Sequence, residues 1–119
     1  MIRRGDIYWV SPGRGAGREQ LGRRPGVIVQ NDINNEFSET TIVAMLTTHE
    51  FPRLYPTHVE ISAKESGLPE SSTVLLEQIL TVALERLGQR VGQASLATMD
   101  DVDKAIHYTL GLLGCPIAR

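Results

Sequence analysis

Short apolar and β-branched runs, separated by turn-forming residues, restrict the fold of this chain more than any other feature of its sequence. Six runs of strand length recur, and glycine, proline, asparagine, serine or charged residues separate most of them. The runs are Ile7 to Val10, Val27 to Val29, Thr41 to Leu46, Val59 to Ile61, Thr73 to Leu76 and Ile79 to Val82. This pattern predicts a mainly β body. Residues 42–46 are uniformly apolar, which is typical of a central strand covered on both faces.

Helices are predicted as additions to this β body. Short helices are expected from Asp32 to Glu36 and from Ala63 to Ser66, and one long helix from about Met99 to Leu113. Thr98 and Asp101 resemble a capping box for the long helix. Its apolar residues fall at steps of three and four, which predicts a stripe packed on the sheet: Met99, Val102, Ile106, Leu110 and Leu113. We therefore expect a partly open β-barrel with a C-terminal helix, built as one domain over residues 1–119.

The net charge of −2 conceals a strong asymmetry along the chain. Residues 1–30 have a net charge of +4, and the remaining 89 residues have a net charge of −6. The positive charge comes from six arginines: Arg3, Arg4, Arg14, Arg18, Arg23 and Arg24. Such a segment attracts polyanions such as RNA, although chance clustering in a polar loop is an equally good reading of the charge alone.

Several classes of protein are disfavoured by the sequence. The single cysteine, Cys115, cannot form an intrachain disulfide, and no apolar run approaches the roughly 18 residues of a membrane span. The three histidines, His49, His58 and His107, lack the spacing of metal ligands, and no Walker-type phosphate loop is present. We therefore expect a cytoplasmic protein with no membrane contact, no metal site and no cofactor.

Candidate functional residues gather around the first long loop. The segment from Ser11 to Arg23 contains four glycines and three arginines, as a loop that wraps an RNA backbone would need, although a plain hairpin loop fits as well. Arg24 and Pro25 stand at the entrance to the second strand, where a guanidinium is held for phosphate binding. Thr47 ends the third strand, where β-propensity alone is the simpler explanation of a threonine.

An ordered series of motifs resembles the MazF/PemK family of toxins. The series spans about Arg3 to Leu113 and comprises R-G-D-I-Y-W at Arg4 to Trp9, G-R-E-Q-L-G-R-R-P-G-V-I-V at Gly17 to Val29, Gln30 to Asp32, Phe37 with Ser38, Pro56 to Ile61, and Leu76 to Ile79. Each motif is weakly specific, whereas the ordered set is highly specific. The resemblance implies an SH3-like, CcdB/PemK toxin-like β-barrel that forms a homodimer.

The resemblance also implies an activity, partners and site residues. It implies metal-independent, sequence-specific cleavage of single-stranded RNA to 2′,3′-cyclic phosphate and 5′-hydroxyl ends, inhibited by a MazE-like antitoxin. Arg24, Thr47 and Glu19 would be catalytic, and Gln20 and Gln78 would contact RNA beside the loop arginines Arg18 and Arg23. Two differences from relatives stand out, because Arg18 replaces a common serine and Gly26 a common apolar residue. In addition, Leu75 and Glu77 occupy positions where one plasmid-borne branch uses arginine and aspartate for catalysis.

Chemistry suggests a role for each implied catalytic residue. A guanidinium with a pKa above about 12 is a poor base, so we expect Arg24 to stabilise negative charge and to be a potential acid. Thr47 would donate a hydrogen bond to a phosphoryl oxygen, and Glu19 would be the base, with His49 as a less favoured candidate. Two other functions stay open: a gyrase-inhibiting CcdB-like toxin, whose characteristic C-terminal aromatic and acidic residues this chain lacks, and a noncatalytic RNA-binding module.

Overall fold

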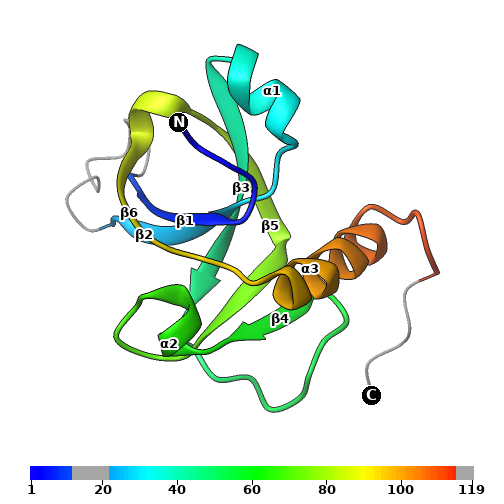
Figure 1. Ribbon diagram of the computed structural model, residues 1–119. Coiled ribbons are helices and arrows are strands. Elements are labelled where there is room, and N and C mark those ends of the chain that lie inside the picture. The colour runs from blue at the N-terminus through cyan, green and yellow to red at the C-terminus, as the bar shows by residue number, and fades with distance from the viewer. Residues whose placement is uncertain (12–21, 115–119) are drawn as a thin grey trace.

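A curled six-stranded antiparallel sheet forms the body of the protein. The computed structural model describes residues 1–11 and 22–114. The strands lie in the order β4-β5-β3-β2-β1-β6, and the sheet curls without closing (Figure 1). Their bounds are β1 Asp6–Val10, β2 Arg24–Ile28, β3 Thr40–Thr47, β4 His58–Ile61, β5 Ser72–Ala83 and β6 Leu87–Gln93. The predicted partly open, mainly β barrel is therefore confirmed.

Three α-helices accompany the sheet within the described residues, and they agree with the prediction in type but not in every boundary. Helix α1 (Asp32–Phe37) and helix α2 (Ala63–Ser66) lie where the sequence predicts them. Helix α3 (Leu96–Thr109) begins three residues earlier and ends four residues earlier than predicted. The expected cap was wrong, because the hydroxyl of Ser95 accepts the N–H of Thr98, which itself lies inside the helix.

The predicted apolar stripe of α3 is only partly correct. Met99, Val102 and Ala105 are buried against the sheet, and Ile106 packs at the edge of the same cluster. Leu110 and Leu113 follow the last helical residue and are exposed. The helix ends before them because Gly111 adopts a left-handed conformation at φ +75°, which redirects the chain.

Two strand predictions needed correction. The runs predicted as two strands, residues 73–76 and 79–82, form the single strand β5. Its register against β3 shifts between Leu75, opposite Met45, and Ile79, opposite Ala44, so residues 76–78 form a bulge without partners on β3. Strand β6 was missed because its sequence, L-G-Q-R-V-G-Q, lacks a continuous apolar run.

Both faces of β3 contact apolar clusters, as its uniformly apolar sequence predicts. Ala44 and Leu46 join the larger cluster, which α3 covers, whereas Val43 joins a smaller cluster with Val10, Ile28 and Val82. Successive side chains of a strand point to opposite faces. Ala44 and Leu46 therefore face one cluster, and Val43 faces the other. The strand is therefore held firmly, and the position of its end at Thr47 is well defined.

A close backbone contact brings helix α2 against β6, where the sheet itself does not close. Gly67 caps α2 at φ +81°, and a Cβ atom there would lie 1.9 Å from the carbonyl oxygen of Val91. A Cβ atom at Gly92 would lie 2.0 Å from the carbonyl oxygen of Ser66. Only glycine permits this approach, which fixes the start of the segment between α2 and β5.

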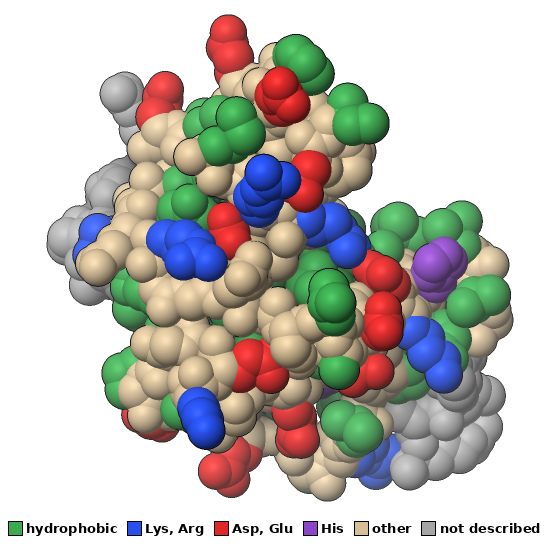
Figure 2. All heavy atoms as spheres, viewed as in Figure 1, with side chains coloured by type: hydrophobic (Ala, Val, Ile, Leu, Met, Phe, Trp, Pro, Cys, Tyr) green, Lys and Arg blue, Asp and Glu red, His purple; other side chains and the backbone are tan. Residues whose placement is uncertain are grey.

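The charge asymmetry of the sequence is reduced by the fold. The Arg4 guanidinium pairs with Asp103 at 2.6 Å, and the main-chain N–H of Arg4 bonds Asp32 at 2.7 Å. The face in Figure 2 carries acidic and basic side chains interspersed. Arg4 therefore links the N-terminal segment to α3 and α1, and its charge is already paired within the fold. No helix among the described residues is long and apolar enough to span a membrane.

Candidate active site

Strand pairing brings the two principal candidate residues together. β2 and β3 pair with Val27 opposite Ala44 and Gly26 opposite Met45. Two further steps in this antiparallel register place Arg24, the first residue of β2, opposite Thr47, the last residue of β3. Residues opposite each other share a face of the sheet, so both side chains emerge at the same rim.

Both side chains keep hydrogen-bond donors available at this rim. Arg24 is exposed and makes one long contact within the described residues, from Nη2 to the carbonyl oxygen of Leu46 at 3.4 Å. The Thr47 hydroxyl accepts the main-chain N–H of His49 at 3.1 Å. That bond uses a lone pair of the oxygen and leaves the hydroxyl hydrogen to donate. The pair therefore offers a guanidinium and a hydroxyl donor to an anion at the end of the strands.

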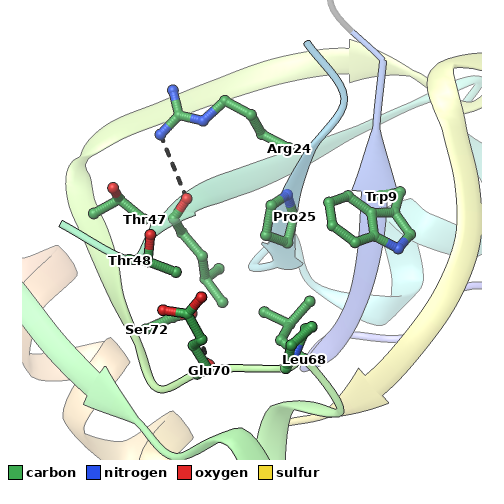
Figure 3. A pocket seen from close by; sticks show the side chains of 10 residues that line it. Trp9, Arg24, Pro25, Thr47, Thr48, Leu68, Glu70 and Ser72 are labelled. Carbon is green, nitrogen blue, oxygen red and sulfur yellow. Dashed lines mark hydrogen bonds between the residues drawn. The ribbon is translucent and has the colours of Figure 1, made fainter. Parts of the chain in front are cut away.

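A cavity of about 320 Å³ opens beside Arg24 and Thr47 (Figure 3). Trp9, Pro25, Leu46 and Leu68 form its apolar surface, and Thr48, Glu70 and Ser72 add polar groups. Figure 3 shows the guanidinium and the two threonines at one side and the Trp9 indole at another. The volume lies at the lower end of the range of about 300–1,000 Å³ that is usual for small-ligand pockets.

Arg24 also lines a second cavity, of about 480 Å³, together with Gln78, Ser11 and Arg86. The β5 bulge leaves Gln78 exposed, with no β3 residue opposite it. Arg86 is anchored by a bond from its Nε to the carbonyl oxygen of Ser11 at 3.0 Å. Arg24 thus lines two cavities, one shared with Trp9 and the other with Gln78.

The remaining predicted site residues divide into two groups. Arg23 is described and exposed, and its guanidinium approaches Gly88 in β6 and lines neither cavity of Arg24. The structure therefore separates Arg23 from its neighbour Arg24. The loop residues Arg18, Glu19 and Gln20 lie outside the described residues.

His49 and His58 line neither of the cavities that Arg24 lines. His49 follows the end of β3, and its ring lies edge-on to the ring of Phe51, with the ring centroids 4.7 Å apart. His58 is nearly buried and its Nε2 lies 3.0 Å from the carboxylate of Glu77. Glu77 stands where one branch of the family has a catalytic aspartate. Here its carboxylate contacts His58 and accepts a hydrogen bond from the hydroxyl of Thr57 at 3.2 Å.

Sequence reasoning missed several residues of the two cavities: Trp9, Glu70, Ser72 and Arg86. Trp9 has a detectable signal, because an aromatic residue in the first strand beside the cationic loop is a candidate stacking surface. Glu70 lies in a P-E-S-S turn that is typical of an ordinary surface connection. Its place in the cavity that Arg24 also lines depends on long-range packing of α2 and is not visible in the sequence.

The chain belongs to a family of toxins. Residues 3–110 match the family described as PemK-like, MazF-like toxin of type II toxin-antitoxin system. The sequence is also 42% identical over 113 residues to Endoribonuclease EndoA of Bacillus subtilis (strain 168), covering 95% of this chain and 97% of that protein. The predicted family is therefore confirmed.

Solved structures share the whole fold. An endoribonuclease from Mycobacterial species, solved in complex with its cognate antitoxin, matches with a TM-score of 0.79 at 27% identity, covering 95% of this chain and 98% of that one. A MazE-MazF structure from Deinococcus radiodurans matches with a TM-score of 0.77 at 21% identity, covering 94% and 97% of the two chains. The second likeness concerns the fold alone.

Proposed function

We propose that this chain, an endoribonuclease of the PemK-like, MazF-like toxin family, cleaves single-stranded RNA at short sequences without a metal ion. The products are a 2′,3′-cyclic phosphate and a 5′-hydroxyl. The observation that carries the proposal is that Arg24 and Thr47, at the ends of the paired strands β2 and β3, line one open cavity. This arrangement fits RNA cleavage, because a phosphodiester with a 2′-hydroxyl needs charge stabilisation more than an added nucleophile.

In the proposed step, the 2′-oxygen attacks phosphorus as its proton leaves to a base. The new O2′–P bond closes the cyclic phosphate, and the P–O5′ bond breaks as the 5′-oxygen takes up a proton. Negative charge grows on the non-bridging oxygens. Arg24 offers its planar fork of N–H donors to these oxygens, and its charge assists proton delivery to the departing oxygen. Thr47 donates its free hydroxyl hydrogen to a non-bridging oxygen.

The rigidity of the rim makes these donors effective. Thr47 ends a strand whose two faces are packed, and Arg24 touches the carbonyl group of the residue before Thr47. Donors fixed before the reaction need no reorganisation in the transition state, and one such donor contributes about 100- to 1000-fold to the rate. The base in this scheme is Glu19, as the sequence predicts, and Glu19 lies outside the described residues.

Mapping the ends of cleaved RNA tests the proposed function. Purified protein is incubated with a long unstructured RNA in excess EDTA, and the new 5′ and 3′ ends are identified. We expect cuts at a short recurring sequence, with 5′-hydroxyl and cyclic phosphate ends. Binding without cleavage would identify a noncatalytic module instead. Loss of cleavage in EDTA, with recovery on adding Mg²⁺, would overturn the metal-independent scheme.

We further propose that the active form is a symmetric cytoplasmic homodimer, because a single 13.1 kDa chain offers little concave surface to an RNA strand. Ile33 and Phe37, one turn apart on α1, are 73% and 78% exposed and supply apolar surface for association. Sedimentation at micromolar concentration should give twice the chain mass. A stable monomer that cleaves RNA at the full rate would refute the dimer.

A MazE-like antitoxin with an acidic disordered tail is the proposed inhibitor, and its tail competes with RNA. The exposed guanidinium groups of Arg23 and Arg24 attract an acidic peptide for the same electrostatic reason that they attract RNA. A labelled, noncleavable RNA bound to the protein should be displaced by the antitoxin encoded beside the gene, and antitoxin binding should weaken as salt rises. A ternary complex with unchanged RNA affinity would contradict a shared groove.

A further inference from the structure

The cavity between Trp9 and Glu70 has the composition of a nucleobase pocket. One surface is the indole of Trp9 with the side chains of Pro25 and Leu68, and the carboxylate of Glu70 lies near Thr48 across the cavity (Figure 3). Proteins that read single-stranded RNA stack an unpaired base on an aromatic side chain and bind its hydrogen-bonding edge with polar groups. Both requirements are met within about 320 Å³.

We propose that Glu70 determines part of the sequence specificity, by accepting a hydrogen bond from the exocyclic amino group of a base stacked on Trp9. The inference rests on the proposed RNA cleavage at Arg24. Arg24 lines both this cavity and the Gln78 cavity, so a phosphate held by its guanidinium would lie next to both. The base in the Trp9 cavity therefore belongs to a nucleotide that flanks the scissile phosphate.

The chemistry of a carboxylate determines which bases it accepts. An ionised carboxylate only accepts hydrogen bonds, and adenine, cytosine and guanine each present an amino group that donates. Uracil presents two carbonyl oxygens beside a single N–H, and those oxygens repel a carboxylate. Glu70 thus favours amino-bearing bases and disfavours uracil at this position. Glutamine has the same shape with one donor and one acceptor, so it accepts the edge of uracil.

The position of Glu70 suits discrimination rather than support of the fold. Its side chain is exposed at the cavity mouth, and its main-chain carbonyl oxygen is the group that accepts the Ser72 hydroxyl at 3.4 Å. A substitution at the carboxylate therefore leaves this structural bond intact. Exposed polar substitutions of this kind usually change stability by no more than about 0.5 kcal/mol, so a change in target sequence reports on recognition.

The test compares cleavage sites of the wild type, Glu70→Gln and Glu60→Gln on an RNA library randomised around the cut. Glu60 is an exposed glutamate on β4 that does not line the Trp9 cavity, so its variant controls for the loss of one negative charge. The wild type should disfavour uracil at one nucleotide flanking the cut. Glu70→Gln should raise the relative use of uracil there by about tenfold, and Glu60→Gln should leave it unchanged.

Three outcomes would overturn the assignment while leaving RNA cleavage established. In the first outcome, the wild type and Glu70→Gln both use the four bases equally at each nucleotide flanking the cut. In the second, the two proteins show the same base preference. Alternatively, Glu70→Gln would lose rate uniformly with an altered pH profile, which would mark a proton-transferring group. Absence of cleavage by the wild type would instead refute the proposed function.

Fluorescence gives an independent readout of the same cavity, because Trp9 is the single tryptophan of the chain. A noncleavable oligonucleotide with 2′-deoxyribose at the cut should quench Trp9 emission on binding, and uracil at the recognised position should weaken that binding about tenfold in the wild type. Quenching with equal affinity for uracil and the amino-bearing bases would overturn the role of Glu70. Binding without any change in Trp9 emission would show that no base stacks on Trp9 in this cavity.

Discussion

Substituting Gly67 with alanine should destabilise the protein and disturb the site wall that follows this residue. The left-handed conformation at φ +81° costs a residue with a Cβ atom about 1–2 kcal/mol. The added atom would also lie 1.9 Å from the carbonyl oxygen of Val91, an overlap with backbone that costs about 1–3 kcal/mol to relieve. A total near 3 kcal/mol lowers the melting temperature of a chain of 119 residues by about 12 °C.

Two other glycines separate the contributions. Gly111 has φ +75° and no atom within 4 Å of an added Cβ, so Gly111→Ala should show the conformational cost alone. Gly92 has no positive φ, and its added Cβ would lie 2.0 Å from the carbonyl oxygen of Ser66, so Gly92→Ala should show the overlap alone. Thermal unfolding followed by circular dichroism measures all three variants.

The Gly67 effect should extend to activity. Residues 68–72 follow this close contact and carry Leu68, Glu70 and Ser72 into the Trp9 cavity. RNA cleavage below the melting temperature should therefore fall more in Gly67→Ala than in Gly111→Ala. If Gly67→Ala and Gly111→Ala melt at the same temperature, the backbone overlap at Val91 costs nothing, and the contact between α2 and β6 does not require glycine.

Further predictions concern the rim and the fold. Arg24→Ala should lower the cleavage rate about 100- to 1000-fold with an unchanged melting temperature. The control Arg3→Ala removes a charge outside both cavities and should keep the wild-type rate. A folded Arg24→Ala enzyme of full activity would show that Arg24 does not stabilise the transition state. Thr47→Val should lower the rate about 100-fold, as expected for the loss of one fixed donor, and a wild-type rate would remove Thr47 from the mechanism. Burial raises the pKa of Glu65, but hydrogen bonds from Thr98 and Ser95 outweigh it and hold the pKa below its ordinary value of 4.5. The ionised Glu65 carboxylate thus stabilises the fold above pH 4.5. The difference in melting temperature between the wild type and Glu65→Gln should shrink as the pH falls through the lowered pKa. A constant difference from about pH 7 to about pH 3 would contradict this.

Local patterns in the sequence were sufficient for the strands that position Arg24 and Thr47. Pro25 marks the start of β2, and the apolar run before Thr47 marks β3 as a central strand, so both residues were expected at strand ends. Their pairing could not be read with the same certainty, because register depends on contacts between distant segments. In the structure, the pairing of Gly26 with Met45 sets the register of β2 against β3.

Other features depend on packing that leaves little trace in the sequence. The bulge in β5 looked like a gap between two strands, because Glu77 and Gln78 interrupt the apolar run. Strand β6 is formed by pairing with β1 and by the close approach of Gly92 to α2, despite its polar composition. Glu70 reaches the Trp9 cavity on the segment that follows this close approach.

In the proposed reaction, the RNA supplies its own nucleophile at the Arg24 and Thr47 rim. The most direct measurement uses two RNA oligonucleotides that contain a mapped cleavage site and differ only by a 2′-deoxyribose before the scissile phosphate. Both are incubated with the protein in EDTA, and the products are resolved by mass. We predict that the all-ribose RNA is cut to a cyclic phosphate and that the substituted RNA resists cleavage at that bond. Cleavage of the substituted RNA at the same bond and rate would show that water is the nucleophile and would refute attack by the 2′-oxygen.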